Sequence, residues 1–163
     1  NNSITETCGS AILMKFNESL SSGKQSENII LKMVQNKYPK AYIKEGYHKE
    51  YDIMIPEINK TIEVKKDFKS QYTGNVVIEM EMNNRPSGLQ TTTADWWVFH
   101  LDETEIVWIT LERLKEMVEF EDYNLVEFIG EGDEISKQAY LVPKKDLYMY
   151  SNKIKELVKD DIL

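Results

Sequence analysis

Two acidic residues and a lysine lie close together in residues 51–65, at spacings that could bind a metal ion. The runs 51–55 and 61–65 are rich in apolar and β-branched residues and flank a turn-forming segment, so we expect a β-hairpin. If its strands pair symmetrically about the turn, Asp52 faces Glu63 with the Cβ atoms about 5 Å apart. Like charges placed directly opposite each other are destabilising, and a bound cation would offset them.

The ligand atoms indicate which cation this would be. Carboxylate oxygens suit Mg²⁺ or Mn²⁺, and Mg²⁺ is commonly held by one or two carboxylates together with water and substrate phosphate oxygens. Side chains alternate along a strand, so the hairpin has an apolar and a polar face. The apolar face carries Ile53, Ile55, Ile62 and Val64, and the polar face, directed away from the core, carries Asp52, Glu63 and Lys65. The alternative is a surface hairpin with a solvated acidic edge that the lysine offsets.

The composition is that of a folded, soluble protein. The 163 residues are 41% hydrophobic and 29% charged, and this length suits one domain, residues 1–163. No apolar run approaches the roughly 20 residues of a membrane helix, and no signal-peptide pattern is visible. The single cysteine, Cys8, excludes an intramolecular disulfide and cannot form a zinc site alone. We therefore expect a cytoplasmic protein.

The charge is unevenly distributed along the chain. A net charge of −8 argues mildly against a nucleic-acid partner, whose phosphates favour basic surfaces. However, residues 1–75 carry eleven lysines against nine acidic residues, whereas residues 76–163 carry nine basic residues against nineteen acidic ones. The negative charge thus lies mainly away from the hairpin, and a nucleic-acid partner stays open. The excess of lysine over arginine would suit an AT-rich phage or bacterial genome.

Helices and strands surround the hairpin. Ser22 and Gln25 form an N-cap pattern that starts a helix, and Tyr38–Pro39 would end it at about Lys37. Strands are expected at 75–82, 96–101, 105–110 and 137–142, and helices at 111–119 and within 146–163, the last with Tyr150, Ile154, Leu157 and Val158 on its apolar side. This order predicts an α/β fold, a central mixed β-sheet flanked by helices. Its core would span about residues 22–101, with a C-terminal elaboration over 102–163.

Glu27 falls on or beside the buried stripe of the first predicted helix. With Ile30, Leu31 and Val34 it follows the i, i+3, i+4, i+7 spacing. An acid on that stripe is costly unless it is paired or lies near a metal ion. The alternative is an acid that stabilises the positive end of the helix.

Together these positions resemble the PD-(D/E)xK nuclease superfamily, which has the restriction-endonuclease-like fold. Asp52 matches the aspartate of the motif, and Glu63-Val64-Lys65 matches its (D/E)xK on the following strand. Residues 86–89 and 93–99 look like members in which a Ser-Gly loop precedes a Thr-x-Asp turn and an aromatic strand. Tyr51 stands where the motif's name has a proline, a departure that bears on turn geometry. The resemblance covers the predicted core.

This resemblance implies a metal-dependent nuclease. Asp52, Glu63 and the backbone carbonyl of Val64 would hold one or two Mg²⁺ ions, for which Mn²⁺ can substitute, and the metal would polarise the phosphodiester and activate a water. Lys65 would orient that water and stabilise charge on the phosphate. Glu27, which matches an acid often found on the first core helix of the family, would act through a metal-bound water.

Further candidates follow the hairpin. Glu79 is either a third acid beside the metal or half of an exposed strand face, and we assign Glu79 to the metal site and Glu81 to solvent. Arg85, Ser87 and Gln90 could bind the phosphates of the substrate, although loops are often polar without such a role.

The other residues with reactive side chains have structural interpretations. Asp95 is expected to be a turn cap rather than a catalyst. His48 and His100 lack partners at metal-binding spacing, so we expect neither to be a ligand. The three tryptophans are expected in the core rather than as base-stacking platforms.

The favoured hypothesis is a metal-dependent DNA endonuclease, which as a homodimer could cut both strands of a duplex. One alternative is a catalytically inactive nucleic-acid-binding or assembly subunit of the same fold, against which the presence of Asp52, Glu63 and Lys65 argues. A second is an acidic protein-interaction domain unrelated to nucleases. Whether the substrate is DNA or RNA, and whether it is duplex, branched or single-stranded, is left open by the sequence. No membrane partner is expected.

Overall fold

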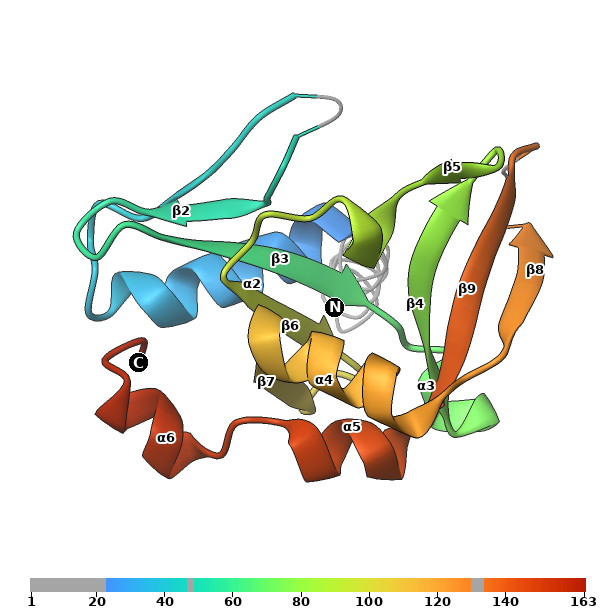
Figure 1. Cartoon of the computed structure of the whole chain (residues 1–163). Coiled ribbons are helices and arrows are strands. Elements are labelled where there is room, and N and C mark those ends of the chain that lie inside the picture. The colour runs from blue at the N-terminus through green and yellow to red at the C-terminus, as the bar shows by residue number, and fades with distance from the viewer. Residues whose placement is uncertain (1–22, 47–48, 130–133) are drawn as a thin grey trace, which may run out of the picture.

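A computed structural model describes residues 23–46, 49–129 and 134–163, and its strands form two sheets (Figure 1). The five-stranded sheet has the order β1-β2-β3-β6-β7, with bounds Tyr42–Ile43, Ile53–Ile55, Lys60–Lys66, Trp96–His100 and Ile106–Thr110. The four-stranded sheet has the order β5-β4-β9-β8, with bounds Arg85–Pro86, Asn75–Met82, Ser136–Pro143 and Leu125–Ile129. The helices are α2 (Gly23–Gln35), α3 (Ser70–Thr73), the 3-10 helix η1 (Gly88–Gln90), α4 (Leu111–Glu121), α5 (Lys144–Tyr150) and α6 (Ile154–Lys159).

The five-stranded sheet is mixed, because β3 and β6 run parallel while its other neighbours pair antiparallel. The predicted α/β fold with a mixed sheet and flanking helices is therefore confirmed at that level. The second sheet was not predicted. Its strand β4 has the predicted bounds, but it pairs with β5 and β9 rather than with the hairpin.

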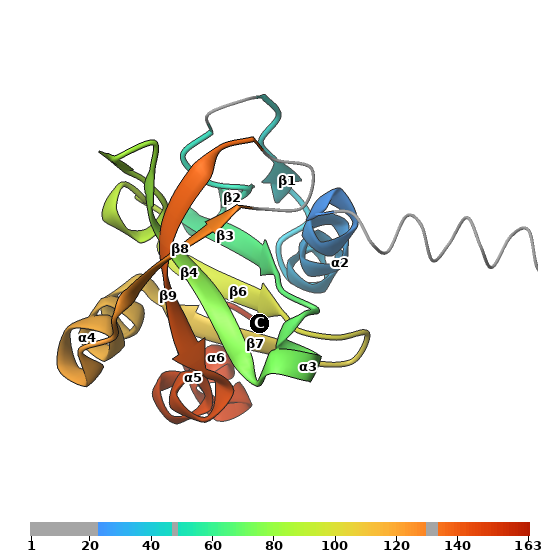
Figure 2. The same cartoon turned by 90° about the vertical axis from the view of Figure 1, so that its right-hand side faces the viewer.

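Each face of the five-stranded sheet has its own hydrophobic core. Helix α2 and the C-terminal region cover one face, where the core includes Ile30, Val34, Ile53, Ile62, Val64, Trp96, Val98, Leu157 and Ile162. Helices α4 and α5 and the second sheet cover the other, where the core includes Val76, Ile78, Trp97, Phe99, Ile109, Leu114, Met117, Val142 and Leu147. Both faces of β6 are therefore covered, which explains its uninterrupted apolar sequence and confirms that the tryptophans belong to the core. Figure 2 shows β4 and β9 crossing over β6 and β7.

Most predicted elements are confirmed with small shifts at their ends. Helix α2 begins at Gly23 and ends at Gln35, before the predicted stop, and its predicted N-cap Ser22 lies outside the described residues. Helix α4 is capped by the Thr110 side chain, which accepts a hydrogen bond from the Arg113 N–H at 3.2 Å. Strand β8 was not predicted, because this short edge strand alternates between exposed and half-buried positions without a buried face.

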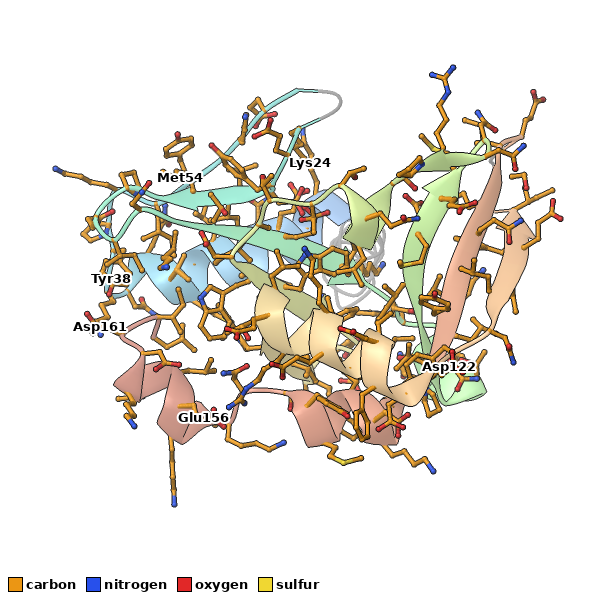
Figure 3. The ribbon with its side chains drawn as sticks, in the orientation of Figure 1. Lys24, Tyr38, Met54, Asp122, Glu156 and Asp161 are labelled. Carbon is orange, nitrogen blue, oxygen red and sulfur yellow. The ribbon has the colours of Figure 1, made fainter. Side chains whose placement is uncertain are left out.

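The predicted C-terminal helix is two helices, α5 and α6. Of its predicted apolar side, Leu157 is buried, but Ile154 and Val158 are exposed because α6 contacts the rest of the chain through one narrow stripe. The end of the chain is attached to the segment after α2, where the Tyr38 hydroxyl donates to the backbone carbonyl of Asp161 (Figure 3).

Strand β4 contains a bulge that separates two glutamates. Glu79 pairs with Ala139 and Glu81 pairs with Gln138, so β4 has one extra residue at this point. Because the two partners are consecutive on β9 and point to opposite faces, Glu79 and Glu81 also point to opposite faces. The predicted alternation, in which both glutamates share a face, is therefore wrong beyond the bulge.

Gly88 allows the loop after β5 to pack directly on this bulge. Its φ of +52° is left-handed, and a Cβ atom built there would lie 2.1 Å from the carbonyl oxygen of Glu79. The neighbouring Ser87 N–H donates to the Met80 carbonyl at 2.9 Å, which holds the loop in this position. Only glycine satisfies both the backbone conformation and the close approach.

We therefore predict that Gly88→Ala destabilises the protein. The left-handed conformation alone costs a non-glycine residue about 1–3 kcal/mol, and displacement of the loop from β4 adds to this. Gly23→Ala is the matched control, because Gly23 has open space around its Cα and should change stability by about 0.5 kcal/mol or less. Urea denaturation of the two variants measures the difference, and equal midpoints would contradict this account of the loop.

Candidate functional site

The hairpin has the predicted register. Ile53 pairs with Ile62 across β2 and β3, which places Asp52 opposite Glu63 at the next position. The Asp52 N–H donates to the Ile62 carbonyl at 2.9 Å, so the ladder continues beyond the last residue assigned to β2. Ile53 and Ile62 are fully buried and direct the acidic residues to the opposite face. The register that brings the two carboxylates together is thus fixed by burial of the apolar face.

Asp52 is much more buried than the sequence indicates, with 5% of its surface exposed. Its Oδ2 accepts a hydrogen bond from the Val64 N–H at 2.7 Å, and its Oδ1 lies 2.9 Å from the Lys49 ammonium. Asp52 lies on the face opposite the isoleucines, as predicted, but this face is covered as well, so the side chain is buried rather than solvated. Asp52 is held by the backbone on one side and by a cation on the other.

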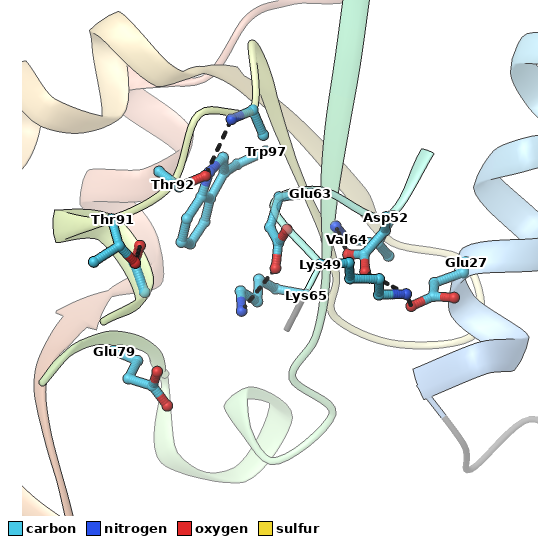
Figure 4. Close-up of polar contacts among 12 residues, drawn as sticks. Glu27, Lys49, Asp52, Glu63, Val64, Lys65, Glu79, Thr91, Thr92 and Trp97 are labelled. Carbon is cyan, nitrogen blue, oxygen red and sulfur yellow. Dashed lines mark hydrogen bonds and ion pairs between the residues drawn. The ribbon is translucent and has the colours of Figure 1, made fainter. Parts of the chain in front are cut away.

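Lys49 joins Asp52 to Glu27 (Figure 4). Its ammonium lies 3.0 Å from Glu27 Oε1, while Glu27 Oε2 is buried and has no hydrogen-bond partner. Burial raises the pKa of Glu27, the hydrogen bond from Lys49 lowers it, and the negative charge of Asp52 raises it further, with a net upward shift. Glu27 is 9% exposed, which confirms its predicted place on the buried side of the first helix.

Glu63 and Lys65 form a second ion pair on the same strand. The Lys65 ammonium lies 3.1 Å from Glu63 Oε1 and 5.2 Å from the centre of the Trp97 ring. Burial raises the pKa of Glu63, Lys65 lowers it, and the charge of Asp52 raises it, with a net upward shift. The repulsion expected between Asp52 and Glu63 is therefore present, but burial is the main cause of the upward shift, and Lys65 opposes both.

A polar cavity of about 190 Å³ adjoins these residues. It is lined by Lys49, Glu50, Glu63, Lys65, Glu79, Gly88, Thr91, Thr92 and Trp97. Glu79 comes from the second sheet and forms an ion pair with Lys137 at 3.5 Å, and in Figure 4 it lies apart from the Asp52 carboxylate. The structure thus brings Glu79 to the same cavity as Glu63 and Lys65, and its role as a metal ligand stays a prediction.

The three predicted substrate-binding residues do not line this cavity. Arg85 is exposed in β5, the Ser87 hydroxyl is buried without a hydrogen-bond partner, and the Gln90 amide donates to the Met80 carbonyl at 2.7 Å. Thr91 and Thr92, from the segment just after them, line it instead. The predicted loop is therefore next to the cavity, but different side chains of that region reach it.

Asp95 has a structural role, but it joins two strands instead of forming the turn cap that was predicted. Its Oδ2 accepts hydrogen bonds from the Thr61 N–H at 2.9 Å and from the Thr61 hydroxyl at 3.1 Å. These bonds hold the beginning of β3 beside the beginning of β6. Asp95 therefore fixes the alignment of the two parallel strands and takes no place in the cavity.

The residues present include the kind of donor that an oxygen-preferring metal ion takes. Within the described residues, no three His, Cys, Asp or Glu side chains are gathered closely enough to form a complete metal cage. Mg²⁺ does not require such a cage, since one or two carboxylates with water and substrate oxygens suffice. Asp52 and Glu63 supply two carboxylates, and the unpartnered Glu27 Oε2 indicates that the local cations leave hydrogen-bonding capacity unused.

Lys49 is the main residue that sequence reasoning missed. It precedes Asp52 by three residues in a segment whose sequence has no clear periodicity. No pattern therefore indicated that its ammonium would contact the Asp52 carboxylate. Thr91 and Thr92 were missed because they follow a short 3-10 helix whose direction is set by Gly88. A useful signal would have been the excess of negative charge among the candidate ligands, which requires a nearby cation.

Comparisons with protein-family models, with curated proteins and with solved structures find no match for this chain. Over the residues that the structure describes, no helix combines the length and the apolar character needed to cross a membrane.

Asp52→Ala should lower the stability of the metal-free protein. The substitution leaves the Val64 N–H and the Lys49 ammonium without their shared partner, at an expected cost of about 2–4 kcal/mol. Asp52→Asn should cost less, because its amide oxygen can still accept from Val64. Urea denaturation with a chelator measures both, and the exposed neighbour Glu50→Ala serves as control. Unchanged stability of Asp52→Ala would show that these contacts are weak.

His100 lies outside the cavity and in the core. It is 1% exposed, its Nδ1 lies 2.7 Å from the Ser26 hydroxyl, and its Nε2 has no hydrogen-bond partner. Burial lowers the pKa of His100, and the nearby charge of Lys66 lowers it further. His48 lies outside the described residues.

This lowered pKa predicts a loss of stability in acid. The unfolded chain takes up a proton at His100 near its ordinary pKa of 6.5, whereas the folded protein resists protonation, so the free energy of unfolding falls as the pH drops through 6.5. The variant His100→Gln should show a shallower fall between pH 8 and pH 5 in urea denaturation. Parallel pH profiles for the two proteins would rule out a contribution from His100.

Proposed function

We propose that this protein is a metal-dependent nuclease that hydrolyses phosphodiester bonds. More specifically, we propose a DNA endonuclease that uses Mg²⁺ or Mn²⁺. The observation that carries the proposal is the confirmed hairpin register, which places Asp52 opposite Glu63 with Lys65 two residues further on the same face. This is the arrangement that the resemblance to PD-(D/E)xK nucleases requires. The polar cavity beside these residues supports it.

The metal-binding part of the proposal assigns Asp52 and Glu63 as ligands, with the Val64 carbonyl as a third oxygen. A divalent ion at this position supplies a Lewis acid and lowers the pKa of a bound water. The chain's own contribution is to hold the two carboxylates rigidly, since Asp52 is fixed by the Val64 N–H and both side chains are largely buried. Rigid ligands lower the cost of ordering the site when substrate arrives.

Lys65 is the residue assigned to the reacting phosphate. Its ammonium borders the cavity beside Glu63 and above the Trp97 ring, and its side chain is 34% exposed. A cation in this position can donate hydrogen bonds to a phosphate oxygen and to the attacking water. Thr91 and Thr92 line the same cavity, and the Thr92 hydroxyl accepts a hydrogen bond from the Trp97 ring N–H at 3.4 Å.

A second candidate function is a nucleic-acid-binding or assembly subunit of the same fold without activity. The observation that favours it is Lys49, because this ammonium already offsets the charges of Glu27 and Asp52 in the absence of a metal. A site that is compensated internally can persist as a structural feature. Metal-dependent turnover separates the two functions.

We predict that Lys65→Ala lowers the cleavage rate by about 10²- to 10⁴-fold, the usual effect of removing a group that acts on the reacting atoms. Lys66→Ala is the matched control. This substitution removes the same charge from the same strand. The Lys66 side chain, however, points to the other face, and its ammonium lies 4.5 Å from the centre of the Phe68 ring. Its cleavage rate should stay within a few-fold of the parent.

The substrates for this test are supercoiled plasmid, a four-way junction, single-stranded DNA and RNA, each with Mg²⁺, with Mn²⁺ and with chelator. Metal-dependent cleavage that Lys65→Ala loses and Lys66→Ala keeps would support the nuclease and identify its substrate class. Binding without cleavage of any substrate would favour the inactive subunit. Equal rates for the parent and Lys65→Ala would refute the assigned site.

A further inference from the structure

We propose that Lys49 is a resident counter-cation that competes with the metal ion for Asp52, so that metal binding displaces the Lys49 ammonium from the carboxylates. The inference rests on the proposed function, since it concerns the same metal site. It assigns to Lys49 a role that the motif does not include, which is to stabilise the site without metal and to set the affinity for the ion.

The contacts of Lys49 are those of a cation built into the site. Its ammonium lies 2.9 Å from Asp52 Oδ1 and 3.0 Å from Glu27 Oε1. The three side chains are 23%, 7% and 12% exposed for Lys49, Asp52 and Glu27, respectively. Ion pairs this far from solvent are weakly screened. The triad therefore holds together in the absence of metal, and its separation requires a competing charge.

The geometry of Asp52 makes the competition direct. Oδ2 accepts a hydrogen bond from the Val64 N–H, whereas Oδ1 has no backbone donor and is the oxygen that Lys49 contacts. A bound Mg²⁺ would lie about 2.1 Å from Oδ1, so with the ammonium 2.9 Å from the same atom the two cations would be at most about 5 Å apart. Two cations at this separation in a poorly solvated site repel each other strongly.

Glu27 supplies a second observation that indicates a ligand. Its Oε2 is buried and has no hydrogen-bond partner, even though Glu27 Oε1 is bonded to Lys49. A buried carboxylate oxygen without a donor is unfavourable. The waters that Mg²⁺ keeps in its coordination shell are such donors, whereas the single ammonium leaves this oxygen unsatisfied. Exchange of Lys49 for a hydrated ion would therefore satisfy more of the site.

The displaced ammonium has a place to go, because Lys49 itself lines the polar cavity. Turning away from Asp52 would direct it toward the space bordered by Glu50, Glu79 and Lys65. No backbone rearrangement is needed for this change, since a lysine side chain has four flexible bonds. The same cavity is where a substrate phosphate would meet Lys65.

The direct test is a titration of the metal-free protein with Mn²⁺. Electron paramagnetic resonance measures the concentration of the free ion and so gives the affinity. Lys49→Met removes the competitor with little change in side-chain length and should tighten Mn²⁺ binding by about tenfold or more, equivalent to about 1.4 kcal/mol. Lys49→Arg, which keeps the charge, should bind close to the parent. Lys44→Met is the control for net charge, because Lys44 precedes Lys49 by five residues but its ammonium lies over the Tyr51 ring. Unchanged or weaker binding by Lys49→Met would overturn the inference.

A second measurement uses the parent protein and so does not depend on the folding of a variant. Reductive methylation of lysines, analysed by mass spectrometry of the peptides, reports how accessible the Lys49 ammonium is. Labelling of Lys49 should increase several-fold when Mn²⁺ is added, while labelling of Lys44 should stay constant. Equal or lower labelling of Lys49 with saturating Mn²⁺ would contradict displacement.

The outcomes separate this inference from the proposed function. Mn²⁺ binding that Asp52→Asn weakens but Lys49→Met leaves unchanged would keep the metal site and refute the competition. Binding by Lys49→Met that exceeds binding by the parent would support the competition even if no nucleic acid is cleaved. Absence of binding by both proteins would refute the metal site and, with it, the competition.

Discussion

The hydrogen bond from the Val64 N–H to the Asp52 carboxylate is the interaction on which the site depends. It ties Asp52, which immediately precedes β2, to the backbone of β3 at Val64, two positions beyond Ile62. The Asp52 backbone is held separately by its own N–H, which donates to the Ile62 carbonyl at 2.9 Å, so the bond from Val64 fixes the side chain. With it, one carboxylate oxygen is committed to the fold and the other is presented to cations. The position of the acid relative to Glu63 is thus a property of the sheet.

This arrangement concentrates more negative charge than the local lysines offset. Burial is the largest cause of the raised pKa of both Glu27 and Glu63, the charge of Asp52 raises both further, and the lysine partner of each acid lowers its pKa. In a largely buried site such repulsion costs stability. Binding of a divalent ion would relieve it. The same excess of negative charge explains why the Lys49 ammonium forms ion pairs with Glu27 and Asp52, although Lys49 itself lies in neither a helix nor a strand.

Local patterns were sufficient to predict the hairpin, its register and the buried place of Glu27, because alternation and helical periodicity act between near neighbours in the chain. They were insufficient wherever contacts join distant segments. The second sheet was missed because β4 and β9 are separated by more than fifty residues and either strand alone also suits the first sheet. The burial of Asp52 was underestimated for the same reason, since an alternation pattern cannot reveal which segments cover the polar face. Lys49 and the threonines of the cavity depend on loop conformation, for which the sequence holds no periodic signal.

The junction between the two sheets decides which of the predicted acids can share a ligand. Asp67 begins this junction, as its N–H donates to the His100 carbonyl at 2.9 Å while its Oδ2 accepts from the Val77 N–H at 2.8 Å. It therefore links the end of β3 to the beginning of β4, whose regular alternation up to Glu79 directs this side chain toward the cavity, whereas the bulge after it changes the direction of Glu81. Glu79 reaches the cavity through a different sheet from Asp52 and Glu63, and Lys137 on β9 partly offsets its charge. Its distance from the hairpin acids thus depends on how the sheets pack, whereas the distance between Asp52 and Glu63 depends on one register. The hairpin pair is therefore the constant part of the site, and the contribution of Glu79 varies with any movement of the second sheet.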